Sequence, residues 1–164
     1  MGADAAADNV MSMPEEESNF VKVLFHLDQD EDGYPPVGAE SLWARIVTEG
    51  YQMDNIPFYV VGVSCEDVVA ATKQKDSILE FTSVVSRSGH STIRVCVNDT
   101  TAIEHLRDDL RKLGCESEQD YTPNLISVDI HPDVDIRLVW NMLEDGLKQE
   151  LWEYEDACIQ HTLD

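Results

Sequence analysis

Basic residues are scarce in this sequence, which has 11 Lys and Arg against 33 Asp and Glu and a net charge of −22 at pH 7. A cationic face is needed to bind the phosphates of nucleic acid or the head groups of an anionic membrane. We therefore expect neither nucleic acid nor a membrane as a direct partner. Two interpretations of the charge remain open: a surface that keeps the protein soluble, or a surface that attracts a basic partner protein.

Long apolar runs are also missing. No stretch approaches the roughly 20 apolar residues that span a bilayer. Residues 1–18 have neither a basic residue nor a sustained apolar run, so they do not match a secretory signal. We expect a cytoplasmic protein in which residues 1–18 are a disordered acidic leader, because they offer little to bury. The 43% hydrophobic content suffices for a core in the rest, which we expect to be one domain over residues 19–160 with a tail at 161–164.

Known catalytic and cofactor motifs are absent from the sequence. It contains no GxSxG, HExxH, GxGxxG or Walker pattern, and its four cysteines are scattered with no CxxC pair. We therefore expect free thiols and no cofactor. These absences favour a protein that is not an enzyme and leave enzymatic activity open.

The first part of the chain is rich in strand-forming segments. Alternating or β-branched residues separated by short turns predict strands at 20–27, 56–63, 66–72, 78–86 and 91–97. An apolar stripe over residues 39–50 that ends at Gly50 predicts a short helix between the first two strands. Tight turns are typical of an antiparallel meander, so we predict a small barrel-like sheet over residues 20–97, with residues 19–97 mainly β.

The second part of the chain shows helical periodicity. Thr101 and Glu104 form a capping-box pattern that opens a helix closed by Gly114. A strand at 125–131 and a long helix at about 134–158 follow. From residue 91 the order strand–helix–strand–helix resembles a ferredoxin-like unit, half or complete according to whether 116–121 is also a strand. The predicted fold class is therefore α+β, with residues 98–160 forming an α/β part.

One short segment carries most of the candidate site residues. Two arginines and a histidine occur close together around a Gly89 turn, with hydroxyls between them. Arginine forks and a histidine bind a phosphate or a carboxylate in many sites. The alternative is a structural turn in which the hydroxyls satisfy the backbone and the arginines balance local acidic residues. The candidate ligand-binding residues are Arg87, Ser88, His90, Ser91, Thr92 and Arg94.

Two acidic segments offer further candidates. Asp28, Asp30 and Asp32 precede Gly33 as in the first half of an EF-hand loop, but Ala39 stands where that loop needs a bidentate Glu. They are at most a weak metal site, and otherwise form a solvated loop. The carboxylates of residues 152–156 are either a docking surface for a basic partner or the solvent face of a helix.

Several blocks of the sequence resemble a family of small bacterial domains with no assigned function. The resemblance spans roughly residues 20–155 and rests on the order and spacing of six short motifs. These are KVLF at 22–25, DGYPP at 32–36, ESLW at 40–43, NIPF at 55–58, EDVV at 66–69 and SGHST at 88–92. It implies no activity, cofactor or catalytic residue.

These observations lead to two functional hypotheses. The first is a non-catalytic interaction protein, for instance an inhibitor or immunity-type factor, whose acidic surface binds a basic partner. The alternative is a domain that binds or hydrolyses a small anionic ligand through Arg87, His90 and Arg94.

Overall fold

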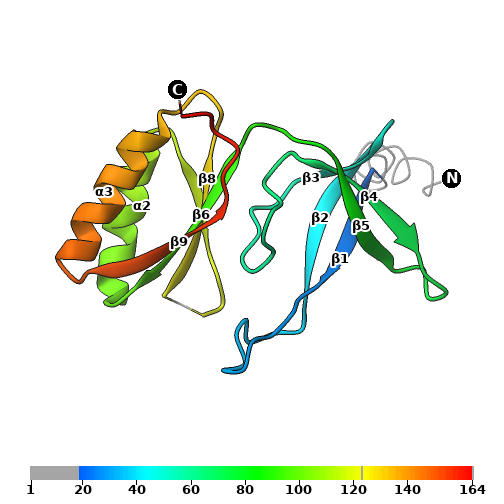
Figure 1. Ribbon diagram of the computed structural model, residues 1–164, viewed down its shortest axis with the longest axis horizontal. Helices are drawn as coiled ribbons and strands as arrows, with labels where there is room; N and C mark the ends of the chain where they lie inside the picture. Colours follow the sequence, from blue (N-terminus) through cyan, green and yellow to red (C-terminus); the bar gives the residue numbers. More distant parts are fainter. Residues whose placement is uncertain (1–18, 123, 164) are drawn as a thin grey trace, which may run out of the picture.

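The computed structural model describes residues 19–122 and 124–163, so the predicted leader over residues 1–18 lies outside the described part. Two β-sheets follow one another along the chain, a closed barrel and then a four-stranded sheet covered by two helices (Figure 1). The protein is therefore α+β, as predicted. Neither helix in the described residues is long and apolar enough to cross a membrane.

The barrel contains the first five strands. They are β1 (Phe20–His26), β2 (Ala39–Val47), β3 (Gly50–Met53), β4 (Val68–Lys73) and β5 (Leu79–Ser86). Neighbours in the chain pair antiparallel, and β1 pairs with β5 in parallel to close the ring. Alternate side chains such as Val23, Leu42 and Val69 fill the interior. The barrel-like sheet is confirmed, but it ends at Ser86 rather than at residue 97.

The predicted helix at 39–50 is wrong, because this segment is strand β2. Leu42 and Ala44 are buried, whereas Trp43 and Ile46, which belonged to the predicted helical stripe, are each nearly half exposed. The apolar residues of this short segment fit the periodicity of a helix as well as that of a strand. Its pairing with β1 over seven residues settles the outcome, since a helix there would leave the β1 edge unpaired.

The predicted strand at 56–63 is also wrong, because residues 54–67 form an extended loop between the two sheets. Three consecutive backbone donors of this loop are satisfied by a side chain instead of a neighbouring strand. The carboxylate of Glu40 accepts hydrogen bonds from the amides of Phe58, Tyr59 and Val60 at 2.8–3.0 Å. Pro57 has no amide to donate, and its carbonyl accepts a hydrogen bond from Ser127 of the second sheet.

The second sheet holds the other four strands and packs on both helices. Its elements are β6 (Ser91–Val97), α2 (Ile103–Lys112), β7 (Glu116–Gln119), β8 (Leu125–Ile130), α3 (Ile136–Lys148) and β9 (Trp152–Cys158), with a 3₁₀ turn η1 (Thr100–Ala102) before α2. The strands lie in the order β7-β8-β6-β9, with β6 and β8 central. The central strands turn one face towards the helices, where Leu110 of α2 packs against Ile93, Val95, Ile126 and Val128. These residues belong to a second core, separate from that of the barrel.

The predicted long helix at 134–158 is really two elements. Helix α3 ends at Lys148, the amides of Glu150 and Leu151 donate to Leu147 and Gly146, and Glu150 has a positive φ of 60°. The chain then reverses into β9, which pairs with β6. Apolar steps of three and four continue across this turn, so helical periodicity alone missed it. The reversal places the ring of Trp152 against Gly146.

Gly146 should be essential for this packing even though it lies inside a helix. A Cβ atom at Gly146 would lie 2.0 Å from the Trp152 ring, whereas one at Gly38 meets nothing within 4 Å. We predict that Gly146→Ala lowers the free energy of unfolding by about 2 kcal/mol because the overpacking outweighs the better helix propensity of alanine. Gly38→Ala is the matched control and should change it by less than about 0.5 kcal/mol. Urea denaturation of both variants measures this, and equal effects would contradict the packing role.

Candidate functional site

A buried carboxylate joins the barrel to the second sheet. Asp67 is fully buried, and its two oxygens accept hydrogen bonds from the amides of Ser64 and Ser88 and from the side-chain amide of Gln160 at 2.8–3.0 Å. Arg87 lies 3.5 Å away as its charged partner. The loop before β4, the link between β5 and β6, and the chain after β9 therefore meet at one side chain.

The first predicted site residues are part of this joint. The Arg87 guanidinium donates to the carbonyl of Gly62 in addition to its contact with Asp67. The Ser88 hydroxyl donates to the carbonyl of Cys65 at 2.8 Å. Both side chains hold segments of this protein together, which matches the structural interpretation of the turn.

Ser91 and Thr92 make internal hydrogen bonds as well. The Thr92 and Ser64 hydroxyls lie 2.8 Å apart, and both residues are fully buried. The Ser91 oxygen lies 2.6 Å from Nδ1 of His161 and accepts from the amide of Gln160. Since Nε2 of His161 faces the carbonyl of His131 at 3.0 Å, Nε2 is the donor and Nδ1 accepts the Ser91 proton. This is the contact of a nucleophile with a base, but the serine has no exposure to solvent.

His90 lies between two carboxylates in the joint. Its Nδ1 is 2.9 Å from the carboxylate of Asp129, its Nε2 is 2.9 Å from that of Glu66, and its ring contacts His131 edge-on. Both nitrogens donate only in the protonated imidazole, so that form fits the two carboxylates best. Burial raises the pKa of Asp129, although the neighbouring His90 acts in the opposite direction. Both ring nitrogens of His90 are therefore paired with carboxylates of the protein itself.

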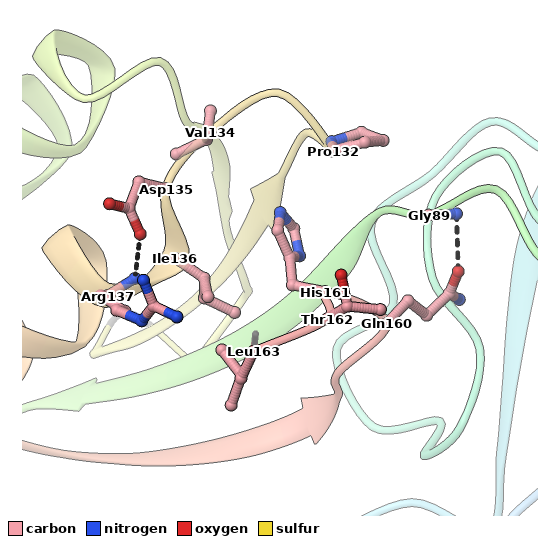
Figure 2. A pocket seen from close by; sticks show the side chains of 10 residues that line it. All are labelled: Gly89, Pro132, Val134, Asp135, Ile136, Arg137, Gln160, His161, Thr162 and Leu163. Carbon is pink, nitrogen blue, oxygen red and sulfur yellow. Dashed lines mark hydrogen bonds between the residues drawn. The ribbon is translucent and has the colours of Figure 1, made fainter.

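A pocket of about 350 Å³ lies beside the joint (Figure 2). It is lined by the turn before α3 and by the C-terminal segment, which includes His161. Within the pocket, the amide of Gly89 donates to the side chain of Gln160, and the carboxylate of Asp135 caps the start of α3 by accepting from the amide of Arg137. These contacts again stabilise the chain itself.

Arg94 differs from the rest of the predicted cluster. It points from β6 towards the barrel and lines a larger pocket of about 460 Å³ between the two sheets. Its Nε donates to Glu155 at 3.0 Å, while one terminal nitrogen, Nη1, is buried and has no hydrogen-bond partner in the described part of the protein. The structure thus places Arg87, His90 and Arg94 in separate environments, and Arg94 is the member that faces a cavity.

The predicted metal residues do not converge. The carboxylate of Asp30 accepts from the amides of Asp32 and Tyr34 at 2.9 Å, which shapes the loop after β1. Asp28 and Asp30 line the Arg94 pocket. Across residues 19–122 and 124–163, no three His, Cys, Asp or Glu side chains are arranged to hold a metal ion.

The four cysteines are free. Burial raises the pKa of Cys65 and of Cys115 to about 12, so both remain neutral thiols at physiological pH. A neutral thiol is a weak nucleophile, which argues against cysteine chemistry at these two positions. Cys96 is exposed on the face of β6 opposite the helices and lines neither of the two pockets described above.

Several residues at the joint and in the pocket were not recognised in the sequence as site residues. Asp129 has a usable signal, since it is a charged residue inside the otherwise apolar or small strand LISVDI. Asp67 lies at the second position of the predicted strand 66–72, where a polar residue gives no such signal. Tyr34 lies in a segment predicted as a loop and Tyr59 in one predicted as a strand, so neither was recognised as a pocket residue.

The comparisons with known proteins identify a family. The sequence model of a family described as "Domain of unknown function (DUF4265)" matches residues 40–154. This chain belongs to that family. A solved structure described as a hypothetical protein from Neisseria gonorrhoeae is similar in fold, with a TM-score of 0.73 at 20% identity, and the match covers 86% of this chain and 96% of that one. No curated protein matches the chain.

The joint should depend on the charge of Asp67. Asp67→Asn keeps the shape but turns an amide NH₂ towards the backbone amide of Ser64 or Ser88, both of which are donors. We predict a loss of about 3 kcal/mol in the free energy of unfolding, typical of breaking a buried charged network. Asp76→Asn, at an exposed turn, is the matched control and should cost less than about 0.5 kcal/mol. If denaturation at pH 7 gave equal losses, Asp67 would not be the joint.

Proposed function

We propose that this DUF4265 protein is a non-catalytic interaction protein, of inhibitor or immunity type, that binds a basic partner protein. The observation that carries the proposal is the distribution of charge on the second sheet. Arg94 is the only Lys or Arg in the fully described strands β6, β7, β8 and β9, and it is 2% exposed. The other charged side chains of these strands are carboxylates.

The strand register places four of these carboxylates on the face opposite the helices, whereas Asp129 is buried against His90 and Asp156 contacts Trp140 of α3. Glu118, Ser127, Arg94 and Glu155 lie side by side across the four strands, and Glu116 and Glu153 flank that row on the two outer strands. Glu116, Glu118, Glu153 and Glu155 are all exposed. The loop 54–67 contacts the centre of this face through Ser127 and Thr92, so the acidic residues border it on both sides. Such a surface attracts a basic partner at long range.

The contacts of the candidate catalytic groups support a binding role. The Ser91–His161 pair is the best nucleophile–base arrangement among the residues discussed, but Ser91 is fully buried. His90 is enclosed by its two carboxylates. Of the alternative anion site formed by Arg87, His90 and Arg94, we carry forward only Arg94, because it lines a pocket. We retain the cytoplasm of a bacterium as the proposed setting, and propose neither nucleic acid nor a membrane as partner.

The second sheet also supports the finer fold proposal. The element order β6-α2-β7-β8-α3-β9, with spatial strand order β7-β8-β6-β9, agrees with a ferredoxin-like βαββαβ unit. We propose that the barrel and the loop 54–67 are additions to that unit, and that the loop covers the centre of the sheet face while its acidic borders stay open to a partner.

Replacing the acidic residues that border this face should weaken the partner complex. The affinity-tagged protein would first be used to isolate its partner from the native host, and the purified pair would then be titrated calorimetrically. We predict that Glu116→Gln/Glu118→Gln/Glu153→Gln weakens binding about tenfold, or about 1.4 kcal/mol. The control Glu49→Gln/Glu104→Gln/Asp145→Asn removes the same three charges from exposed positions elsewhere and should change affinity less than threefold or so.

Two results would contradict the proposal. Equal weakening by both triple variants would mean that net charge alone attracts the partner, without a docking face. A stoichiometric partner with no excess of basic residues would contradict the proposed class.

A further inference from the structure

The pocket beside Arg94 combines an unsatisfied cationic donor with apolar walls. Arg94 is 2% exposed, and its Nη1 is buried without a partner in the described residues, whereas its Nε is bonded to Glu155. A buried charged donor left without an acceptor is costly, and such groups are nearly always paired in folded proteins. The natural partner of a guanidinium edge is a carboxylate.

Two aromatic pairs line the same pocket. Phe25 and Phe81 stack with ring centroids 4.7 Å apart, and Tyr34 and Tyr59 meet edge-on at 6.2 Å. Val61, which also lines the pocket, is 73% exposed, so the cavity opens to solvent. A cavity with apolar walls and a few polar groups at fixed places is the usual form of a small-molecule site.

The remaining charges in the pocket are negative. Asp28, Asp30 and Glu155 line it together with Arg94. Tyr34 lines the pocket together with these charged residues. Burial is the main cause that raises the pKa of Tyr34, so its hydroxyl stays protonated and can donate a hydrogen bond. A phosphate or a dicarboxylate would be repelled by three carboxylates, whereas a ligand with its own ammonium group would be attracted.

We propose that this pocket binds a free amino acid with an apolar or aromatic side chain. Its carboxylate accepts from Nη1 of Arg94, its ammonium group faces the carboxylates of Asp28 and Asp30, and its side chain lies among the aromatic residues. The pocket shares Arg94 and Glu155 with the acidic face, but Glu116, Glu118 and Glu153, whose substitution tests that face, do not line the pocket, so either proposal can fail without the other.

The test uses L-phenylalanine and two analogues, each of which lacks one of its two charged groups. L-phenylalanine carries both charges, 3-phenylpropanoate lacks the ammonium group, and 2-phenylethylamine lacks the carboxylate. Binding to the full chain is followed by heteronuclear NMR up to millimolar probe. We expect saturable shifts around Tyr34 and Arg94 with L-phenylalanine and at least tenfold weaker binding of the other two. Equal binding of 2-phenylethylamine, or no saturable binding of any probe, would overturn the proposal.

Matched arginine variants separate a ligand contact from a structural one. Arg94→Met keeps the bulk of the side chain and removes the unpaired donor. Glu155 loses its hydrogen bond to Arg94 in this variant, but its carboxylate is exposed and can be hydrated instead. We expect this variant to weaken L-phenylalanine binding at least tenfold and to leave the unfolding temperature unchanged or higher. Arg87→Met is the control, which should lower the unfolding temperature and bind the probe as tightly as the wild type. Unchanged probe binding by folded Arg94→Met would overturn the proposal, and if that variant does not fold, the three-probe series on the wild type decides.

Discussion

The structure depends on a single buried carboxylate that lies where three distant segments meet. Asp67 accepts hydrogen bonds from the loop before β4, from the link between the sheets and from the chain after β9. Each of those segments would otherwise bury unpaired donors, because none is part of a regular strand at that point. The carboxylate is in turn compensated by Arg87. The barrel and the helix-covered sheet have separate cores, and this polar joint fixes how they sit against each other.

The same constraint explains what became of the hydroxyls and basic groups around residue 90. A run with two arginines, a histidine and three hydroxyls suggests a ligand site, and most of these groups bind other parts of the protein. Ser88, His90, Ser91 and Thr92 each contact a residue of loop 54–67 or of the C-terminal segment. Beyond them, the alternation of β6 turns Arg94 to the same face as Thr92, where it meets a cavity instead of a backbone carbonyl. Ser91 and Thr92 of β6 thus hold the protein together, whereas Arg94 of the same strand is the residue to which we assign ligand binding.

The second half of the barrel and most of the helical layer could be predicted from the sequence, because the apolar residues of each of these segments fit either a strand or a helix, and not both. Strands β4, β5 and β6 have short turns between them, and α2 ends at Gly114 with a positive φ. The errors occur where local patterns allow two answers. In β2 the apolar residues fit a helix as well as a strand, and only pairing with β1 decides. At residues 149–151 the apolar spacing continues across a reversal. Residues 56–63 have the apolar pattern of a strand, but three of their amides donate to the side chain of Glu40, a contact that no local pattern reveals. The candidate cluster was found, but no local pattern reveals which of its cations faces solvent, a carboxylate or a cavity.

Arg94, unlike Arg87, has a buried side-chain donor without a partner in the described residues, and we assign this donor to a ligand carboxylate. Side-chain ¹⁵N NMR of the arginine guanidinium groups during a titration with L-phenylalanine tests this assignment directly. The account predicts that the Arg94 N–H resonances shift saturably and exchange more slowly with water, while those of Arg87 stay unchanged. Saturation of the probe without any change at Arg94, or with the same change at Arg87, would contradict it.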